Sequence, residues 1–200
     1  MYPREREPEL TVVGRFATTA PPGAFEPELL AYARRREIRR GFVSRVTAAL
    51  TGRPGRYVHL DRWTGLDRLL RATHEDPAVP PAEAETELLV TVGRMAPNGT
   101  PAEADRLVFL RATVDRAADP ERFELHFGSL VGLCVAEDSF GGSLLLRSVT
   151  DPFAYTGLLW WHDPTADDRM RASTAWRTAR TRLAAMARLT EDLARPLTAL

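Results

Sequence analysis

Short apolar runs alternate with polar, proline-containing turns along the chain, and their spacing predicts alternating strands and helices. In the first half, runs rich in Val, Leu, Phe and Trp predict strands over residues 9–16, 41–50, 57–63 and 86–95. Helices are predicted over about residues 25–38, where Leu29, Leu30 and Ala33 share one face, and over about 64–74. The resulting order, β-α-β-β-α-β, is the ferredoxin-like pattern.

The second half repeats this order. Strands are predicted over residues 106–112, 143–149 and 154–161. A helix is predicted to begin near Asp119, which suits an N-cap, and further helices begin near Asp163 and cover 174–188. Only the end of the segment T190EDLARPLTAL200 is available for a fourth strand.

Two copies of one seven-residue frame, Tyr-x5-Trp, stand 98 residues apart as Y57VHLDRW63 and Y155TGLLWW161. A looser echo relates residues 16–32 to residues 111–127. The pattern predicts an internal duplication, with a first unit over residues 1–95, a linker over 96–105 and a second unit over 106–200. An alternative alignment matches 9–16 with 87–95 and makes 101–118 helical, but it leaves the first unit without its fourth strand.

A β-α-β-β-α-β unit whose third strand ends in Trp, before a short acidic helix, resembles the antibiotic biosynthesis monooxygenase family. The resemblance implies an α+β fold in which two tandem ferredoxin-like units form an intramolecular dimeric α+β barrel. It also implies that the space between the two sheets is a ligand pocket. Haem-degrading relatives place an axial ligand near the position of His74, but they need a polar side chain on the first strand, where this chain has Val12 and Val13.

Strand alternation places alternate side chains on opposite faces. We predict that the face pointing between the sheets carries, in the first copy, Tyr57, His59, Asp61 and Trp63. The other face, with Val58 and Leu60, is then expected beneath the helices. The equivalent inward face of the second copy carries Tyr155, Gly157, Leu159 and Trp161, which lack ionisable groups apart from the tyrosine phenol. A catalytic site is therefore predicted in the first unit.

His59 and Asp61 are the predicted catalytic pair, because a histidine oriented by a carboxylate can act as a general base on a phenol or enol. The structural alternative is an exposed pair on an edge strand. Tyr57, Trp63, Tyr155 and Trp161 are expected either to line a substrate pocket or to anchor the core. Charges within strands need partners, so each of three strand arginines either forms a salt bridge or stabilises a substrate anion: Arg15, Arg45 and Arg94.

The amino-acid composition limits which classes of protein the chain can belong to. The 27 basic and 27 acidic residues balance and are interspersed, which disfavours nucleic-acid binding. No apolar run approaches the roughly 18 residues of a membrane span. The single Cys134 excludes an internal disulfide, and neither metal-ligand spacing nor a nucleotide-binding motif is present, so no cofactor is expected. We expect a cytoplasmic protein, with homodimerisation through exposed edge strands as a possibility.

All of the basic residues are arginine, which is typical of a GC-rich genome such as that of an actinobacterium. Together with the resemblance, this predicts a cofactor-independent monooxygenase of secondary metabolism that acts on a polycyclic aromatic or polyketide intermediate. Two alternatives stay open: a polyketide cyclase of the same fold, and a non-catalytic protein that binds a ligand or stabilises a partner.

Overall fold

The structure is a computed structural model that describes residues 9–35, 37–75, 79–95 and 98–198. In chain order its elements are β1 (Leu10–Ala17), α1 (Pro22–Arg34), β2 (Phe42–Leu50), β3 (Arg56–Trp63), α2 (Leu66–Glu75), β4 (Ala84–Met95), the 3₁₀ helix η1 (Pro101–Glu103), β5 (Arg106–Val114), α3 (Pro120–Cys134), β6 (Phe140–Ser148), β7 (Ala154–Trp161), α4 (Pro164–Ala172), α5 (Thr174–Ala184) and β8 (Ala187–Pro196). None of the described helices combines the length and the apolar character that crossing a membrane requires.

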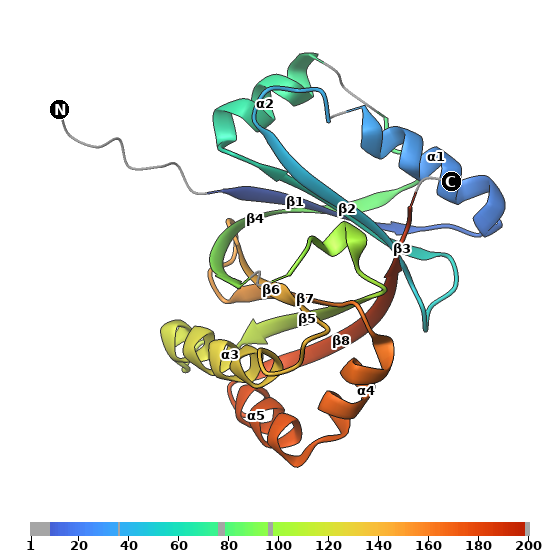
Figure 1. The fold of residues 1–200 in the computed structure, drawn as a ribbon. Coiled ribbons are helices and arrows are strands. Elements are labelled where there is room, and N and C mark those ends of the chain that lie inside the picture. The colour runs from blue at the N-terminus through green and yellow to red at the C-terminus, as the bar shows by residue number, and fades with distance from the viewer. Residues whose placement is uncertain (1–8, 36, 76–78, 96–97, 199–200) are drawn as a thin grey trace.

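The strands form one closed antiparallel barrel in the order β1-β3-β2-β8-β5-β7-β6-β4. Each half contributes four neighbouring strands in the ferredoxin-like order, with its first strand paired to its third and fourth. The halves meet at two junctions, where β2 pairs with β8 and β4 pairs with β6. The chain is therefore an α+β fold of two tandem ferredoxin-like units that form an intramolecular dimeric α+β barrel (Figure 1).

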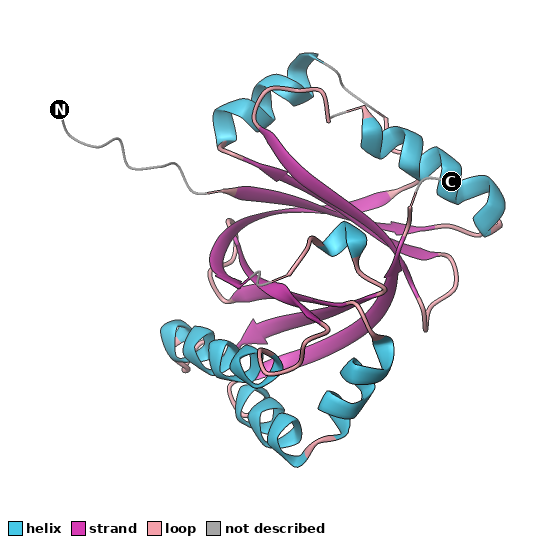
Figure 2. Cartoon of the chain, viewed as in Figure 1, coloured by secondary structure: helices cyan, strands magenta, loops and turns pink. Residues whose placement is uncertain are grey.

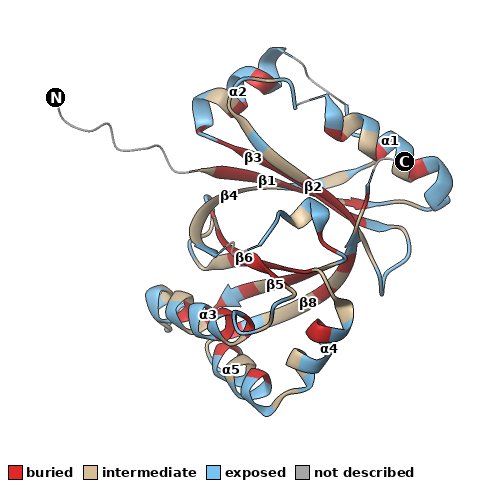
Figure 3. Cartoon of the chain, in the orientation of Figure 1, coloured by how far each residue is buried: buried red, intermediate tan, exposed pale blue. Residues whose placement is uncertain are grey.

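The helices cover the barrel on two opposite sides (Figure 2). On one side α1 and α2 cover the first sheet, and on the other α3, α4 and α5 cover the second. Most strand residues are buried or half-buried between these helices and the barrel interior (Figure 3). The core inside the barrel draws residues from both units, and its largest members are Leu60, Leu89, Leu107, Phe109, Leu144, Leu146, Leu158 and Trp160.

The predicted orientation of the Tyr-x5-Trp strands is wrong. Tyr57 packs against Phe25 of α1, and Trp63 packs against Leu69 of α2, so the face with His59 and Asp61 lies beneath the helices. Val58 and Leu60 instead point into the barrel. The second unit follows the same rule: Tyr155, Leu159 and Trp161 pack on its helices, and the side of Gly157 faces α3 as well. Apolar alternation cannot distinguish these faces, because in a covered barrel both are buried.

The two junctions between the units are unequal. The β4–β6 ladder extends over residues 89–95, whereas β2 pairs with β8 only from Ala48 to Leu50. Within the described residues, the segment 42–47 of β2 therefore has no strand partner on that side. Past the ladder, the Leu197 amide donates a hydrogen bond to the Thr47 carbonyl at 2.7 Å. This leaves an opening along β2 that the region around η1 borders.

Most predicted elements are present. The Asp119 carboxylate accepts a hydrogen bond from the Glu121 amide at 3.0 Å, as expected of an N-cap. The helix predicted to reach residue 188 ends at Ala184, and β8 begins three residues later. The alternative with a helix over 101–118 is wrong, because this stretch holds η1 and β5. Of the predicted units and linker, residues 1–8, 36, 76–78, 96–97 and 199–200 lie outside the described residues.

Candidate functional site

The same aromatic contact appears in both units, and it fixes which residues correspond. The Phe25 and Tyr57 rings lie 4.9 Å apart at 45°, and the Phe123 and Tyr155 rings lie 5.0 Å apart at 45°. Each member of one pair lies 98 positions from its counterpart. The units can therefore be compared position by position on this side of the sheets.

A buried polar array lies beneath α1 in the first unit. Thr47 Oγ1 lies 2.9 Å from His59 Nδ1, and His59 Nε2 lies 3.0 Å from Asp61 Oδ1. All three residues are 4% exposed or less. The Tyr32 ring of α1 meets the His59 ring nearly edge-on, with centroids 6.0 Å apart. The predicted pair is thus in contact, and the alternative of an exposed pair on an edge strand is wrong because β3 lies between β1 and β2.

The array can move a proton. If Nε2 carries the ring proton toward Asp61, Nδ1 accepts a hydrogen bond from the Thr47 hydroxyl. The contact between His59 and Asp61 is close but not aligned as a straight N–H···O hydrogen bond. Even so, a carboxylate against the ring stabilises the positive charge that forms when the ring takes up a proton. Thr47, which the sequence interpretation missed, is the side chain through which a proton would reach His59.

The second unit has no such array. Leu145 and Gly157 face each other across β6 and β7 as Thr47 and His59 do across β2 and β3. A Cβ added to Gly157 would lie 2.5 Å from Cε2 of Phe127, so this ring from α3 fills the space that the histidine occupies in the first unit. The duplicated fold therefore keeps a polar centre on one side and an apolar core on the other.

A cavity of about 500 Å³ opens where β2 lacks a strand partner, and we call it the seam cavity. It is lined by two of the arginines predicted to bind substrate, Arg45 and Arg94, and also by Thr47. Arg45 forms an ion pair with Glu37 at 2.8 Å, and burial lowers the pKa of its guanidinium. Further lining residues from the barrel interior are Arg62, Leu144 and Trp160. The cavity thus combines cations, an apolar wall and the outer end of the polar array.

The duplicated aromatic residues have different surroundings. Trp63 and Trp161 are completely buried, and each makes a steep edge contact with a Phe ring. Neither lines the seam cavity or the cavity at the barrel end described next. The Tyr155 hydroxyl donates to Glu124 at 2.9 Å, and burial raises the pKa of this phenol to about 12. Tyr57 also has a raised pKa through burial, and it borders the second cavity.

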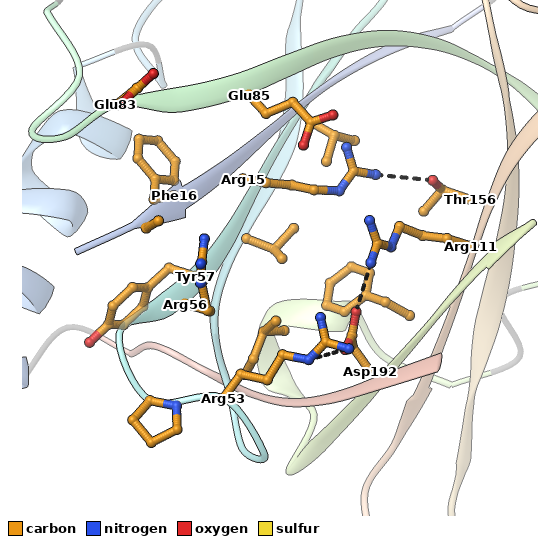
Figure 4. Close-up of a pocket in the computed structure, with 16 residues that line it drawn as sticks. Arg15, Phe16, Arg53, Arg56, Tyr57, Glu83, Glu85, Arg111, Thr156 and Asp192 are labelled. Atoms are coloured by element: carbon orange, nitrogen blue, oxygen red, sulfur yellow. Dashed lines mark hydrogen bonds and ion pairs between the residues drawn. The ribbon is translucent and has the colours of Figure 1, made fainter. Parts of the chain in front are cut away.

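A larger cavity of about 650 Å³ lies at the end of the barrel near the β2–β3 hairpin, and we call it the barrel-end cavity (Figure 4). Arg15, the third predicted arginine, pairs with Glu87 at 3.2 Å and donates to Thr156 at 3.3 Å. On the facing side Arg111 pairs with Asp192 at 3.4 Å. Hence the three strand arginines divide between two cavities. Arg111 could have been predicted from the sequence. Both predicted first strands have an arginine just before an Ala-Thr dipeptide, as R15FAT18 and R111AT113.

No protein-family model matches the chain, and no curated protein matches it by sequence. Its structure is similar to that of a candidate monooxygenase from Fusobacterium nucleatum, with TM-score 0.79 and 9% identity over 97% of this chain and 94% of that one. An anthrone oxidase-like protein gives TM-score 0.73 and 12% identity over 98% and 93%. A major regulator of staphylococcal pathogenesis gives TM-score 0.60 and 9% identity over 94% and 99%. At these identities the similarity shows the fold alone.

Proposed function

We propose that the chain is a cofactor-independent monooxygenase that oxidises an electron-rich carbon of an aromatic or polyketide-type substrate. The observation that carries the proposal is the buried Thr47–His59–Asp61 array, which is present in one unit only and adjoins a cavity lined by three arginines. A fully buried polar cluster that the duplicate has replaced by Leu and Gly is not needed for the fold. The structural similarity to a candidate monooxygenase and an anthrone oxidase-like protein supports the reaction class by analogy.

The substrate is placed in the seam cavity with a phenol or enol oxygen at Thr47. Its proton passes through the Thr47 hydroxyl to His59, and Asp61 stabilises the imidazolium. Arg45 and Arg94 line the same cavity and would offset the negative charge of the phenolate or enolate. Trp160 and Leu144 supply the apolar wall for the ring system.

The reaction balances without an external reductant. The anion gives one electron to dioxygen, and the substrate radical and superoxide combine to form a C–O bond. The imidazolium returns its proton to the peroxide. Loss of water then breaks the O–O bond and the remaining C–H bond, so that a CH₂ group and O₂ become a carbonyl and H₂O. All four electrons come from the substrate. Given the arginine-only basic composition, we place such a substrate in actinobacterial secondary metabolism.

The test is oxygen uptake with anthrone as the probe. The wild type is expected to consume one O₂ per anthraquinone formed. His59→Gln is expected to lower this rate by about 10²–10⁴-fold, the usual contribution of a general base. His74→Gln is the matched control, because His74 is an exposed histidine of the same unit, on α2, and its loss should leave the rate unchanged.

The other outcomes separate the alternatives. Product formation that proceeds without oxygen from a linear polyketide probe, and still requires His59, would indicate a cyclase. Anthrone binding that quenches tryptophan fluorescence, with neither turnover nor oxygen uptake, would indicate a non-catalytic ligand carrier. Equal oxygen uptake by wild type and His59→Gln would remove the array from the mechanism.

A further inference from the structure

The barrel-end cavity is a separate site with its own chemistry, and this inference does not rest on the proposed function. We propose that it binds a small aromatic carboxylate, held between Arg15 and Arg111. The volume of about 650 Å³ lies within the usual range of small-molecule sites. Its walls come from both units, so the site depends on the closed barrel.

The two arginines occupy corresponding places in the duplicated units. Arg15 faces Val58 across β1 and β3, and Arg111 faces Thr156 across β5 and β7; Val58 and Thr156 are 98 positions apart. Each arginine has one acidic partner from its own unit's fourth strand, Glu87 or Asp192. The two units therefore carry matched arginine–carboxylate pairs, and both arginines line one cavity.

The guanidinium groups converge. In Figure 4, the side chains of Arg15 and Arg111 extend toward one another from facing walls. Arg15 reaches across the barrel to Thr156, the strand neighbour of Arg111. Two cations brought together inside a partly enclosed cavity repel one another, and an anion bound between them relieves this repulsion. Each guanidinium has five N–H donors in a planar fork, which suits a carboxylate.

The acidic residues near the cavity offset part of this repulsion but do not use all of the guanidinium donors. The lining includes four arginines, at positions 15, 53, 56 and 111, against three acids. Asp192 is already shared by Arg111 and Arg53, at 3.4 and 3.2 Å. The other two acids, Glu83 and Glu85, are exposed, so water screens their charges. In the inner part of the cavity Arg15 and Arg111 are thus balanced by Glu87 and Asp192, and each guanidinium keeps N–H donors beyond those of its ion pair with which to bind a ligand carboxylate.

The floor of the cavity favours an aromatic ligand. Val13, Val58 and Phe109 line it from beneath and belong to the core inside the barrel. A flat ring system placed on these side chains would put a carboxylate attached to its edge at the level of the two arginines. This arrangement combines an apolar base with a few convergent polar groups, as small-molecule sites usually do.

The test is titration calorimetry with 1-naphthoate, using neutral 1-naphthamide for comparison. Saturable one-to-one binding of 1-naphthoate is expected, and the amide should bind at least about 10-fold more weakly, since it lacks the charge-assisted hydrogen bonds. Arg15→Met and Arg111→Met should each weaken 1-naphthoate binding by about 10-fold or more. Arg188→Met, which removes an exposed arginine of β8, is the matched control and should have no effect.

Further variants separate this site from the seam cavity and from misfolding. His59→Gln and Arg94→Met should leave 1-naphthoate binding unchanged, and their weakening it instead would overturn the proposal by moving the ligand to the seam cavity. If Arg15→Met loses its fold because Glu87 is left unpaired, Thr156→Val keeps all charges and should still weaken binding measurably. Equal affinity for the acid and the amide, or binding that Arg111→Met does not change, would equally overturn the assignment.

Discussion

At the scale of single residues, the most informative difference between the units is that the position of His59 in the first unit is occupied by Gly157 in the second. Gly157→Ala is expected to destabilise the protein by about 1–3 kcal/mol, because its Cβ would press on the Phe127 ring at 2.5 Å. Leu29 of the first unit corresponds to Phe127. Adding Phe127→Leu to Gly157→Ala should therefore restore much of the lost stability. Urea unfolding of the single and double variants measures both effects.

The matched control for this glycine is Gly128, on the same helix as Phe127. A Cβ at Gly128 meets no atom within 4 Å, so Gly128→Ala should stabilise the protein by about 0.5–1 kcal/mol through helix propensity. If Gly157→Ala were as harmless as Gly128→Ala, Phe127 would not be filling the space that corresponds to His59.

A second residue-scale prediction concerns pH. Burial raises the pKa of Tyr155 to about 12, above the value of about 10 in an unfolded chain. The folded protein therefore holds this phenolic proton more tightly, so its contribution to stability is fully present below about pH 10 and is lost as the pH rises from about 10 to 12. Absorbance at 295 nm should show a late-titrating tyrosine that disappears in Tyr155→Phe. Titration of every tyrosine near pH 10 would contradict the buried contact with Glu124.

The sequence predicted the contact between His59 and Asp61 but not its location. Two side chains at alternate positions of one strand share a face whatever lies above it, so their proximity follows from strand geometry alone. Which face points inward depends on what covers the sheet. Here Val58 and Leu60 fill the barrel while Tyr57 and Trp63 meet helices, and both sets are equally hidden from water. Thr47 was missed because its role depends on the register between β2 and β3.

At the scale of elements, periodicity and turn residues were enough to predict the strands and helices, and the duplication predicted how they associate. The exception is the C-terminal part of the second unit. The residues of β8 include Arg188, Glu191, Asp192 and Arg195, so the strand lacks a clear apolar run. It is held instead by a long ladder with β5 and by ion pairs to Arg111 and Arg171. Such long-range partners are not visible in a local pattern.

The pairing of the strands also determines where two copies of the chain could associate through strand edges. Closing a barrel removes the free edges of its sheets. Among the described strands, several segments nevertheless lack a neighbour on one side, among them 42–47 of β2, 84–87 of β4 and 187–192 of β8. The prediction of a homodimer through edge strands therefore has more than one candidate surface, and the surface along 42–47 of β2 borders the seam cavity. A partner strand placed there would also limit access to Thr47.

At the scale of the whole molecule, the two predicted units, 1–95 and 106–200, are joined through the barrel interior. Leu60 of the first unit and Leu107, Phe109 and Trp160 of the second belong to one core inside the barrel. Each unit alone would expose that surface together with the edges of two strands. We therefore infer that neither unit is stable without the other.

This predicts a single cooperative unfolding transition. Phe123→Ala tests it, because Phe123 is completely buried in a cluster whose buried members all belong to the second unit. The substitution is expected to lower the free energy of unfolding by about 3–5 kcal/mol. In variants that keep only Trp63 or only Trp161 as the fluorescent probe, the Phe123→Ala change should lower both unfolding midpoints by the same amount. A shift confined to the Trp161 signal would show two independently folding domains, and the barrel interior would then contribute less to stability than its burial indicates.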